Sequence, residues 1–188
     1  PKWKGKIVIN NPIVAGTARE SFVGLLYTKI VDVDFFQYLV KNQDIAIIGD
    51  EQLQIYWVIV GKRPIALFPS GGRVQEYIAA GAPIAWQIPI EGTFMGGSGS
   101  GLAVMNKAPH PNAARVFINW LLSKEGQTVW SRSYLFASLR SDVSTDHLQP
   151  EDVPARNIQY FMADGPDFIE KQEGYQKRAV EIFGPLIR

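Results

Sequence analysis

Glycine and serine residues in the segment Gly96–Gly101 (GGSGSG) are the first place to look for chemistry in this sequence. A serine-hydrolase elbow has the pattern G-x-S-x-G, but after Ser98 the last glycine position holds Ser100. A dinucleotide-binding loop has the pattern G-x-G-x-x-G, and counted from Gly97 its last position holds Leu102. A phosphate-binding P-loop ends in Gly-Lys, and the segment contains no lysine. None of these three enzyme motifs is complete.

The histidines and the paired carboxylates also offer little catalytic chemistry. His110 and His147 lie far apart in loop-like sequence, where a lone surface histidine is more common than a catalytic or metal-binding one. Asp32 and Asp34 are better explained by helix capping, and the pair at 151–152 by a solvated loop. We therefore predict no catalytic residues, no metal ligands and no enzyme activity.

The composition is that of a folded protein without a charge bias. Hydrophobic residues make up 46% of the 188 residues, which permits a sizeable core. The 19 Lys and Arg residues nearly balance 18 Asp and Glu residues, so charge gives no argument for a nucleic-acid partner. The absence of cysteine excludes disulfides and Cys-based zinc or iron–sulfur sites, and we predict no cofactor. No apolar run approaches the roughly 20 residues that a membrane helix needs.

Short apolar runs alternate with helical patterns along the first half of the chain. Strands are predicted at residues 6–10, 45–48, 64–68 and 84–89. Helical patterns lie between them, and Asp50 is predicted to cap one of these helices. Two amphipathic helices are predicted after Pro111, the second of them capped by Ser123. The alternation predicts an α/β sheet whose ligand lies beyond the ends of the strands.

Four segments resemble a known family, in the family's order. They are PKWKGKI at the start, GKRPIAL, GAPI with its later EGT, and NKAPHPNAARVFINWLLSKEGQTVW. Together they resemble the ABC-transporter extracytoplasmic solute-binding proteins, in the class that includes binders of ferric iron, thiamine and polyamines. The resemblance implies a type II periplasmic-binding-protein-like α/β fold: a lobe with a mixed sheet flanked by helices, plus C-terminal helices that belong to the other lobe.

The same resemblance implies how the chain divides. Residues 1–92 are expected to form most of the second lobe, and residues 93–105 a hinge or crossover strand that includes Ser98. Residues 106–188 are expected to be the C-terminal helical part of the first lobe. In the family, PKWKGKI follows a whole half-domain, so we expect this chain to be a C-terminal portion whose signal peptide lies upstream. The implied location is periplasmic or extracytoplasmic.

A candidate ligand-binding turn precedes the first predicted helix. A strand that delivers Gly16 and Thr17 to a helix start can bind an anion through free amides and the helix dipole. Thr17 also fits the N-cap position, with Glu20 completing a capping box, and such capping alone is the alternative explanation.

A second candidate loop follows the strand at residues 64–68. The Ser70 hydroxyl and the neighbouring Gly71 amide offer oxyanion donors, and Phe68 is expected either in the core or against an apolar part of the ligand. The arginines nearest the proposed cleft in sequence are Arg19, Arg73 and Arg140. An arginine fork binds carboxylate or phosphonate at two points, so these residues favour a small anionic organic ligand unless they lie on the open surface.

A ferric site is not expected in this portion of the chain. In iron-binding members of the family, adjacent tyrosines follow the strand that corresponds to PIALF. Here the following positions are Pro69, Ser70, Gly71 and Gly72, and the nearest tyrosine is Tyr77.

The favoured function is capture of a small solute and its delivery to the membrane subunits of an ABC permease. A ligand-sensing module of a signalling system is the alternative, and an enzyme built on the same lobes is a more remote one. The predicted helices after Pro111 would lack part of their lobe, so this chain is also expected to self-associate through apolar faces.

Overall fold

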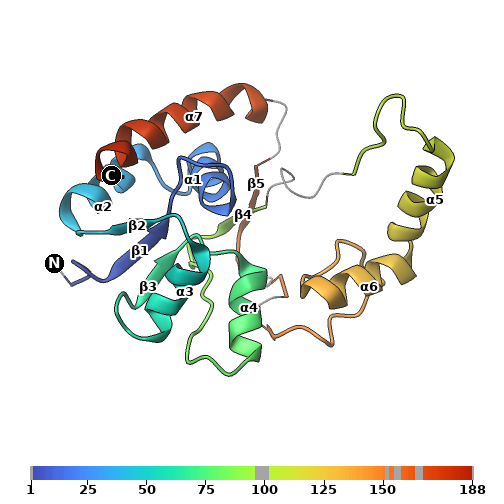
Figure 1. Cartoon of the computed structure of the whole chain (residues 1–188), viewed down its shortest axis with the longest axis horizontal. Coiled ribbons are helices and arrows are strands. Elements are labelled where there is room, and N and C mark those ends of the chain that lie inside the picture. The colour runs from blue at the N-terminus through green and yellow to red at the C-terminus, as the bar shows by residue number, and fades with distance from the viewer. Residues whose placement is uncertain (1, 96–101, 151–152, 155–157, 164–166, 188) are drawn as a thin grey trace. The chain divides into compact units, whose positions relative to one another are not determined.

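The computed structural model describes residues 2–95, 102–150, 153–154, 158–163 and 167–187 (Figure 1). Residue contacts divide the chain into two units, which are described separately. Unit 1 comprises Pro1–Ser98 and Ile158–Arg188, and unit 2 comprises Gly99–Asn157. No helix in the described part of the chain is long and apolar enough to cross a membrane.

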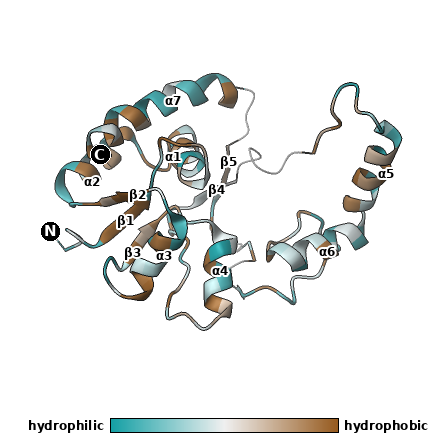
Figure 2. Ribbon diagram, in the orientation of Figure 1, coloured by the Kyte–Doolittle hydropathy of each residue, from teal (hydrophilic) through white to brown (hydrophobic). Residues whose placement is uncertain are grey.

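A parallel sheet forms the centre of unit 1. Its strands, in the order β2-β1-β3, are β1 (Ile7–Asn10), β2 (Ala46–Ile48) and β3 (Ile65–Leu67). Both pairings of β1 are parallel. The strands are hydrophobic along their length (Figure 2), as expected for a parallel sheet covered on both faces.

Six helical segments surround this sheet. They are α1 (Thr17–Tyr27), α2 (Val33–Asn42), α3 (Glu51–Ile59), α4 (Gly71–Ala79), α7 (Phe168–Phe183) and the short 3-10 helix η2 (Gly184–Leu186). The core of unit 1 is built from β1 together with α1, α2 and α7, while α3 packs on the strands separately. Buried Gln54 of α3 donates to the carbonyl of Leu67 at 2.8 Å, which fixes α3 against β3.

Three phenylalanines make the centre of this core. Phe22 lies 4.7 Å from Phe36 and 5.4 Å from Phe183, measured between ring centroids. All three side chains are fully buried. Because they come from α1, α2 and α7, the C-terminal helix is part of the core that the first two helices build.

The position of α7 corrects the expected division of the chain. Residues 106–188 were expected to belong together, but residues 158–188 group with unit 1. The physical reason is the apolar stripe of α7, since Ala179, Ile182 and Phe183 are buried against α1 and α2. The polar residues between 141 and 154 gave no indication in the sequence that the helix after them packs on unit 1.

A second pair of strands lies where the chain leaves unit 1 and returns to it. The strands β4 (Thr93–Met95) and β5 (Tyr160–Met162) pair in parallel. The expected hinge strand over 93–105 is thus a strand at its first three residues, and residues 102–105 follow outside any strand. Residues 96–101, including Ser98, lie outside the described residues.

The two sheets also correct the expected mixed sheet, since every strand pair among the described residues is parallel. Residues 84–89 were expected to be a strand and are instead outside any ladder. Gly92 directly before β4 has φ of 110°, and a Cβ there would lie 2.6 Å from the carbonyl oxygen of Gln159. Glycine is therefore required where β4 meets β5.

Among the described residues of unit 2, two helices form the regular part, α5 (Pro111–Leu121) and α6 (Lys124–Tyr134). The predicted starts are confirmed: Pro111 is in the first turn of α5, and the Ser123 hydroxyl accepts from the Gly126 amide at 3.2 Å. The chain turns tightly between the two helices at this cap. A Cβ on Gly126 would therefore lie only 2.2 Å from the carbonyl oxygen of Trp120.

Candidate functional site

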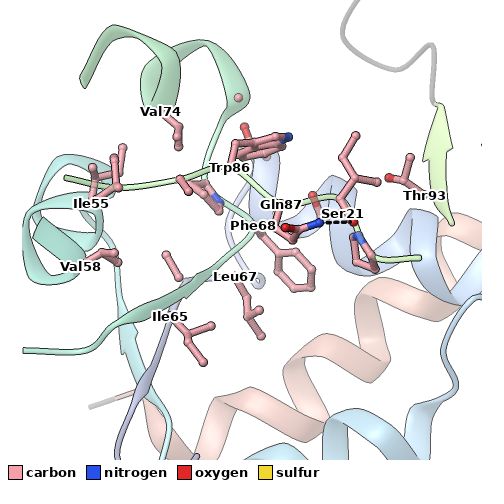
Figure 3. Close-up of a pocket in the computed structure, with 18 of the residues that line it drawn as sticks. Ser21, Ile55, Val58, Ile65, Leu67, Phe68, Val74, Trp86, Gln87 and Thr93 are labelled. Atoms are coloured by element: carbon pink, nitrogen blue, oxygen red, sulfur yellow. Dashed lines mark hydrogen bonds between the residues drawn. The ribbon is translucent and has the colours of Figure 1, made fainter. Parts of the chain in front are cut away.

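A pocket of about 630 Å³ lies within unit 1, beside the outer edge of β3 (Figure 3). Every residue from Pro64 to Pro69 lines it, and so does every residue from Ile84 to Pro89. Side chains of α1, α3 and α4 close it, and Gly92 and Thr93 lie at one end. None of the residues that line the pocket is charged.

The pocket has a polar end and an apolar end. Ser21, Gln87 and Thr93 gather on one side of the view in Figure 3, and Ile55, Val58 and Val74 lie on the other. Thr17, one helical turn before Ser21, also lines the pocket. The Gln87 side chain donates to its neighbour's carbonyl, the oxygen of Ile88, at 3.1 Å. The polar end therefore offers hydroxyl groups and an amide but no ionisable side chain.

Three of the predicted ligand-binding residues line this pocket: Thr17, Phe68 and Gly71. Phe68 also packs against the core, with its ring centroid 6.2 Å from that of Phe36, and its contact with a ligand stays a prediction. Gly16 and Arg19 flank Thr17 without lining the pocket. Ser70 is next to Gly71 in the sequence but likewise does not line the pocket.

The start of α1 differs from the predicted capping box. Gly16, not Thr17, is the N-cap residue, and no side chain caps this helix. The Glu20 amide donates to the Gly16 carbonyl oxygen at 3.1 Å, as in an ordinary first turn. Gly16 has φ of 143°, which a residue with a side chain rarely adopts. Thr17 is thereby left exposed at the first helical position, beside amides that have no partner within the helix.

The start of α4 already holds a carboxylate from the protein. The Ser70 hydroxyl accepts from the Arg73 amide at 3.4 Å, and the Ser70 amide donates to the Glu51 carboxylate. The same carboxylate lies 3.6 Å from Nε of Arg73. Glu51 thus fills the position in which Ser70 was expected to hold an anion. Nothing in the sequence marked this contact, because it joins the starts of two helices, α3 and α4, that are distant along the chain.

Arg140 belongs to unit 2 and binds within that unit. Its Nε and Nη2 each lie 2.9 Å from an oxygen of Asp142, and its Nη1 donates to the Leu122 carbonyl at 3.1 Å. The hydrogen bond from Arg140 also lowers the pKa of Asp142 below its ordinary value. Arg140 therefore joins α5 to the loop after α6 and does not line the pocket.

A serine, a histidine and an aspartate meet in unit 2. Ser131 Oγ lies 2.9 Å from Nε2 of His147, whose Nδ1 lies 3.4 Å from Asp146. The Ser131 hydroxyl donates to the Phe136 carbonyl at 2.6 Å, so its oxygen must accept from His147. A nucleophilic serine donates its proton to the histidine, so the hydrogen bond seen here runs in the opposite direction.

The histidine in this group corrects the expectation of a lone surface residue. The side chain of His147 is only 8% exposed, and Ser131 is 1% exposed. The contacts fix the loop after α6 onto that helix. We assign the group a structural role.

The lining residues that were not proposed from the sequence include the polar Ser21, Gln87 and Thr93, and also Trp86. Ser21 could have been found, because it lies four residues after Thr17 and hence on the same helical face. The other three reach the pocket only because residues 84–93 fold back beside β3. Among the described residues, no group of three or more His, Cys, Asp or Glu side chains is placed to hold a metal ion.

Residues 59–157 match the family model of the bacterial extracellular solute-binding proteins. The match covers more than half of the chain, and the chain belongs to this family. It includes β3, α4, much of the pocket lining and all of unit 2. A search among curated proteins found no match. Solute binding outside the cytoplasm, as part of ABC transport, is the role of this family.

Proposed function

We propose that this chain captures a small anionic organic solute and delivers it to the membrane subunits of an ABC permease. Within its family, we place it in the class that includes binders of ferric iron, thiamine and polyamines, without the ferric ligands. We further propose that it is the C-terminal portion of a two-lobed protein. In that arrangement β4 and β5 would be the connections about which the lobes close.

The polar end of the pocket is the observation that carries the proposal. Thr17, Ser21 and Thr93 present hydroxyl groups there, next to the N-terminus of α1. The helix dipole favours negative charge at this point. No acidic side chain lines the pocket to repel an anion. An adjoining apolar wall at Phe68 suits the organic part of such a solute.

Arg19 does not line the pocket, but it is the predicted arginine nearest to this end along the chain. Arg73 and Arg140 are engaged with Glu51 and Asp142 respectively. Arg19 is half-buried in the first turn of α1 and forms no ion pair with any carboxylate that the structure describes. Its fork would bind a carboxylate or phosphonate held at the start of the helix.

Titration calorimetry against a panel of solutes tests this proposal. The panel holds carboxylates, phosphonates, sugar phosphates, thiamine, polyamines and ferric salts. We expect an anionic organic member to bind, and Arg19→Ala to weaken it by about 1.5–3 kcal/mol, the contribution of a hydrogen bond to a charged group. Thr17→Val should weaken it less, by about 1 kcal/mol.

Arg115→Ala is the matched control, because this exposed arginine lies on α5 in the other unit. It should leave the affinity unchanged. Binding that is insensitive to both Thr17→Val and Arg19→Ala would contradict the proposed site. A panel in which only cationic or ferric solutes bind would contradict the proposed solute class.

A further inference from the structure

Positive charge gathers at one end of the central sheet, in residues 2–6 (KWKGK) before β1 and residues 62–63 (KR) before β3. Because β1 and β3 are parallel, both segments lie at the same end of the sheet. We call residues 2–6 and 62–63 the basic edge, and we propose that it binds the anionic phospholipid headgroups of a membrane surface. None of these residues lines the pocket, so the inference does not depend on the proposed solute.

Contacts hold the two segments of the basic edge side by side. The Ile65 amide donates to the Lys6 carbonyl at 3.2 Å. Gly5 lies beside Arg63, since a Cβ on Gly5 would be 3.9 Å from Nη1 of that arginine. The same Nη1 donates to the Asp44 carbonyl at 2.6 Å, and Asp44 directly precedes the residues that lead into β2. The basic edge is therefore one continuous surface.

The charge of the basic edge is largely uncompensated. Its five basic residues face one acidic residue, Asp44, in the three segments that meet there, 2–6, 43–45 and 57–64, which leaves an excess of four positive charges. The four lysines are exposed. None of the five basic side chains forms an ion pair with a carboxylate that the structure describes. The net charge of the whole chain is only +1, so the excess is local.

Tryptophan rings lie among these lysines. Trp3 is 44% exposed, and the ammonium groups of Lys2 and Lys6 lie 4.7 and 5.9 Å from its ring centroid. The ammonium group of Lys62 lies 3.5 Å from the ring centroid of Trp57. Exposed tryptophan beside lysine is typical of the membrane interface, where the ring lies at the level of the headgroups and the ammonium groups reach the phosphates.

The role of the family favours lipid over nucleic acid as the anionic partner. Solute-binding proteins of this family act outside the cytoplasm as part of ABC transport, where a membrane surface is close by. Each Lys or Arg near an anionic bilayer strengthens binding by about fivefold, so an excess of four charges gives roughly several hundredfold. Such attraction would hold this end of unit 1 against the membrane.

Flotation with lipid vesicles tests the proposal on the whole chain. One set of vesicles contains phosphatidylcholine alone, and the other contains phosphatidylcholine and phosphatidylglycerol at about 2:1. We expect binding to the mixed vesicles only. It should fall by about tenfold or more between roughly 0.05 and 0.5 M NaCl, because salt screens charges on an exposed surface.

A pair of triple variants separates the basic edge from net charge. Lys2→Gln/Lys4→Gln/Lys6→Gln should lower the partition coefficient on mixed vesicles by about a hundredfold. The matched control removes the same charge from exposed residues of unit 2, as Lys107→Gln/Arg115→Gln/Lys124→Gln. It should bind nearly as the wild type does. All six side chains are exposed, so both variants should keep the melting temperature of the wild type.

Tryptophan fluorescence shows which surface faces the lipid. Mixed vesicles whose phosphatidylcholine carries brominated acyl chains quench a tryptophan that lies at the interface. We expect quenching in the wild type and the loss of most of it in Trp3→Phe. Trp130→Phe is the matched control, because Trp130 is also 44% exposed but lies in unit 2, and it should be quenched like the wild type.

Four results would overturn the proposal. Failure to bind the mixed vesicles, or equal binding to both sets, means that the basic edge does not recognise anionic lipid. Equal losses in the two triple variants mean that only net charge acts. Quenching that is lost in Trp130→Phe and kept in Trp3→Phe places the lipid contact on α6. Tighter binding of a single-stranded oligonucleotide than of mixed vesicles means that the partner is an anionic polymer.

Discussion

The two units of this chain bury hydrophobic side chains to very different extents. Unit 1 has a continuous core, at whose centre Phe22, Phe36 and Phe183 are fully buried. In unit 2, the buried hydrophobic residues among those described are Leu121 and Val143. Aromatic residues of α5 and α6 are instead exposed, including Phe117, Trp120, Trp130 and Tyr134.

The difference shows what stabilises each unit. Unit 1 is held by non-local apolar contacts between helices that are distant in sequence. Unit 2 is held mainly by local polar contacts, such as the Ser123 cap and the pairing of Arg140 with Asp142. Exposed surface ion pairs contribute little, so we expect unit 2 to be the less stable unit and its apolar faces to seek a partner.

Truncating one phenylalanine in each unit gives the largest expected contrast. Phe183→Ala should destabilise unit 1 by about 3–5 kcal/mol, since it removes a fully buried ring from the core. Phe117→Ala should cost less than about 0.5 kcal/mol, because that side chain is 56% exposed. Chemical denaturation measures both. Equal effects would mean that α5 packs into a core of its own.

Replacing a helical glycine by alanine should change the free energy of unfolding in opposite directions at two positions. Gly126→Ala should destabilise α6 by about 1–3 kcal/mol or more, because its Cβ would overlap the backbone at Trp120. Gly174→Ala in α7 should stabilise by about 0.5–1 kcal/mol, since nothing lies within 4 Å of its Cβ position. Denaturation of the two variants gives the values. A stabilising Gly126→Ala would show that the α5–α6 corner is looser than described.

The exposed face of α5 gives a prediction about association. We propose that the isolated chain self-associates through this face, and expect Trp120→Lys to weaken the association by about 1 kcal/mol or more. Sedimentation at a series of concentrations measures it. Lys41→Ala is the control, because this residue lies on α2 in unit 1. A chain that stays monomeric at every concentration contradicts the proposal.

The smallest expected effect is a pH dependence in unit 1. Hydrogen bonds from Lys171 and from the Tyr27 hydroxyl, the latter at 2.6 Å, lower the pKa of Asp167. A lowered folded-state pKa stabilises the fold above the ordinary aspartate value of about 3.9, and this contribution is lost as pH falls through the lower folded value.

Asp167→Asn should therefore reduce the melting temperature at neutral pH and differ least from the wild type at the acidic end. Tyr27→Phe should raise the pKa of Asp167 towards its ordinary value, as read from an NMR titration of the carboxyl carbon. A constant difference between Asp167→Asn and wild type at every pH would show that the ion pair contributes nothing.

The parts of this fold that could be predicted from sequence are those fixed within a few residues. The Asp50 and Ser123 caps each bond an amide three residues ahead, and both predictions are confirmed. The alternation of strand and helix in residues 1–80 is equally local and also correct. The resemblance to solute-binding proteins, carried mainly by short segments, is confirmed by the family match over residues 59–157, whereas the class within that family stays a prediction.

The features that escaped prediction depend on contacts distant in sequence. Ser70 looked free to hold an anion, but the Glu51 carboxylate at the start of α3 accepts from its amide. His147 looked exposed in the sequence, but residues 135–147 fold so that its side chain contacts Ser131. Residues 84–89 have strand periodicity, yet pairing depends on a neighbouring strand and not on the segment itself.

The central claim is that a solute binds in unit 1 at the polar end of the pocket. Hydrogen exchange followed by mass spectrometry, with and without the tightest anionic solute of the panel, tests it most directly. We expect slower exchange in peptides that cover residues 16–21 and 84–93, and no change in α6. Protection confined to α5 and α6, or spread evenly over both units, would contradict it.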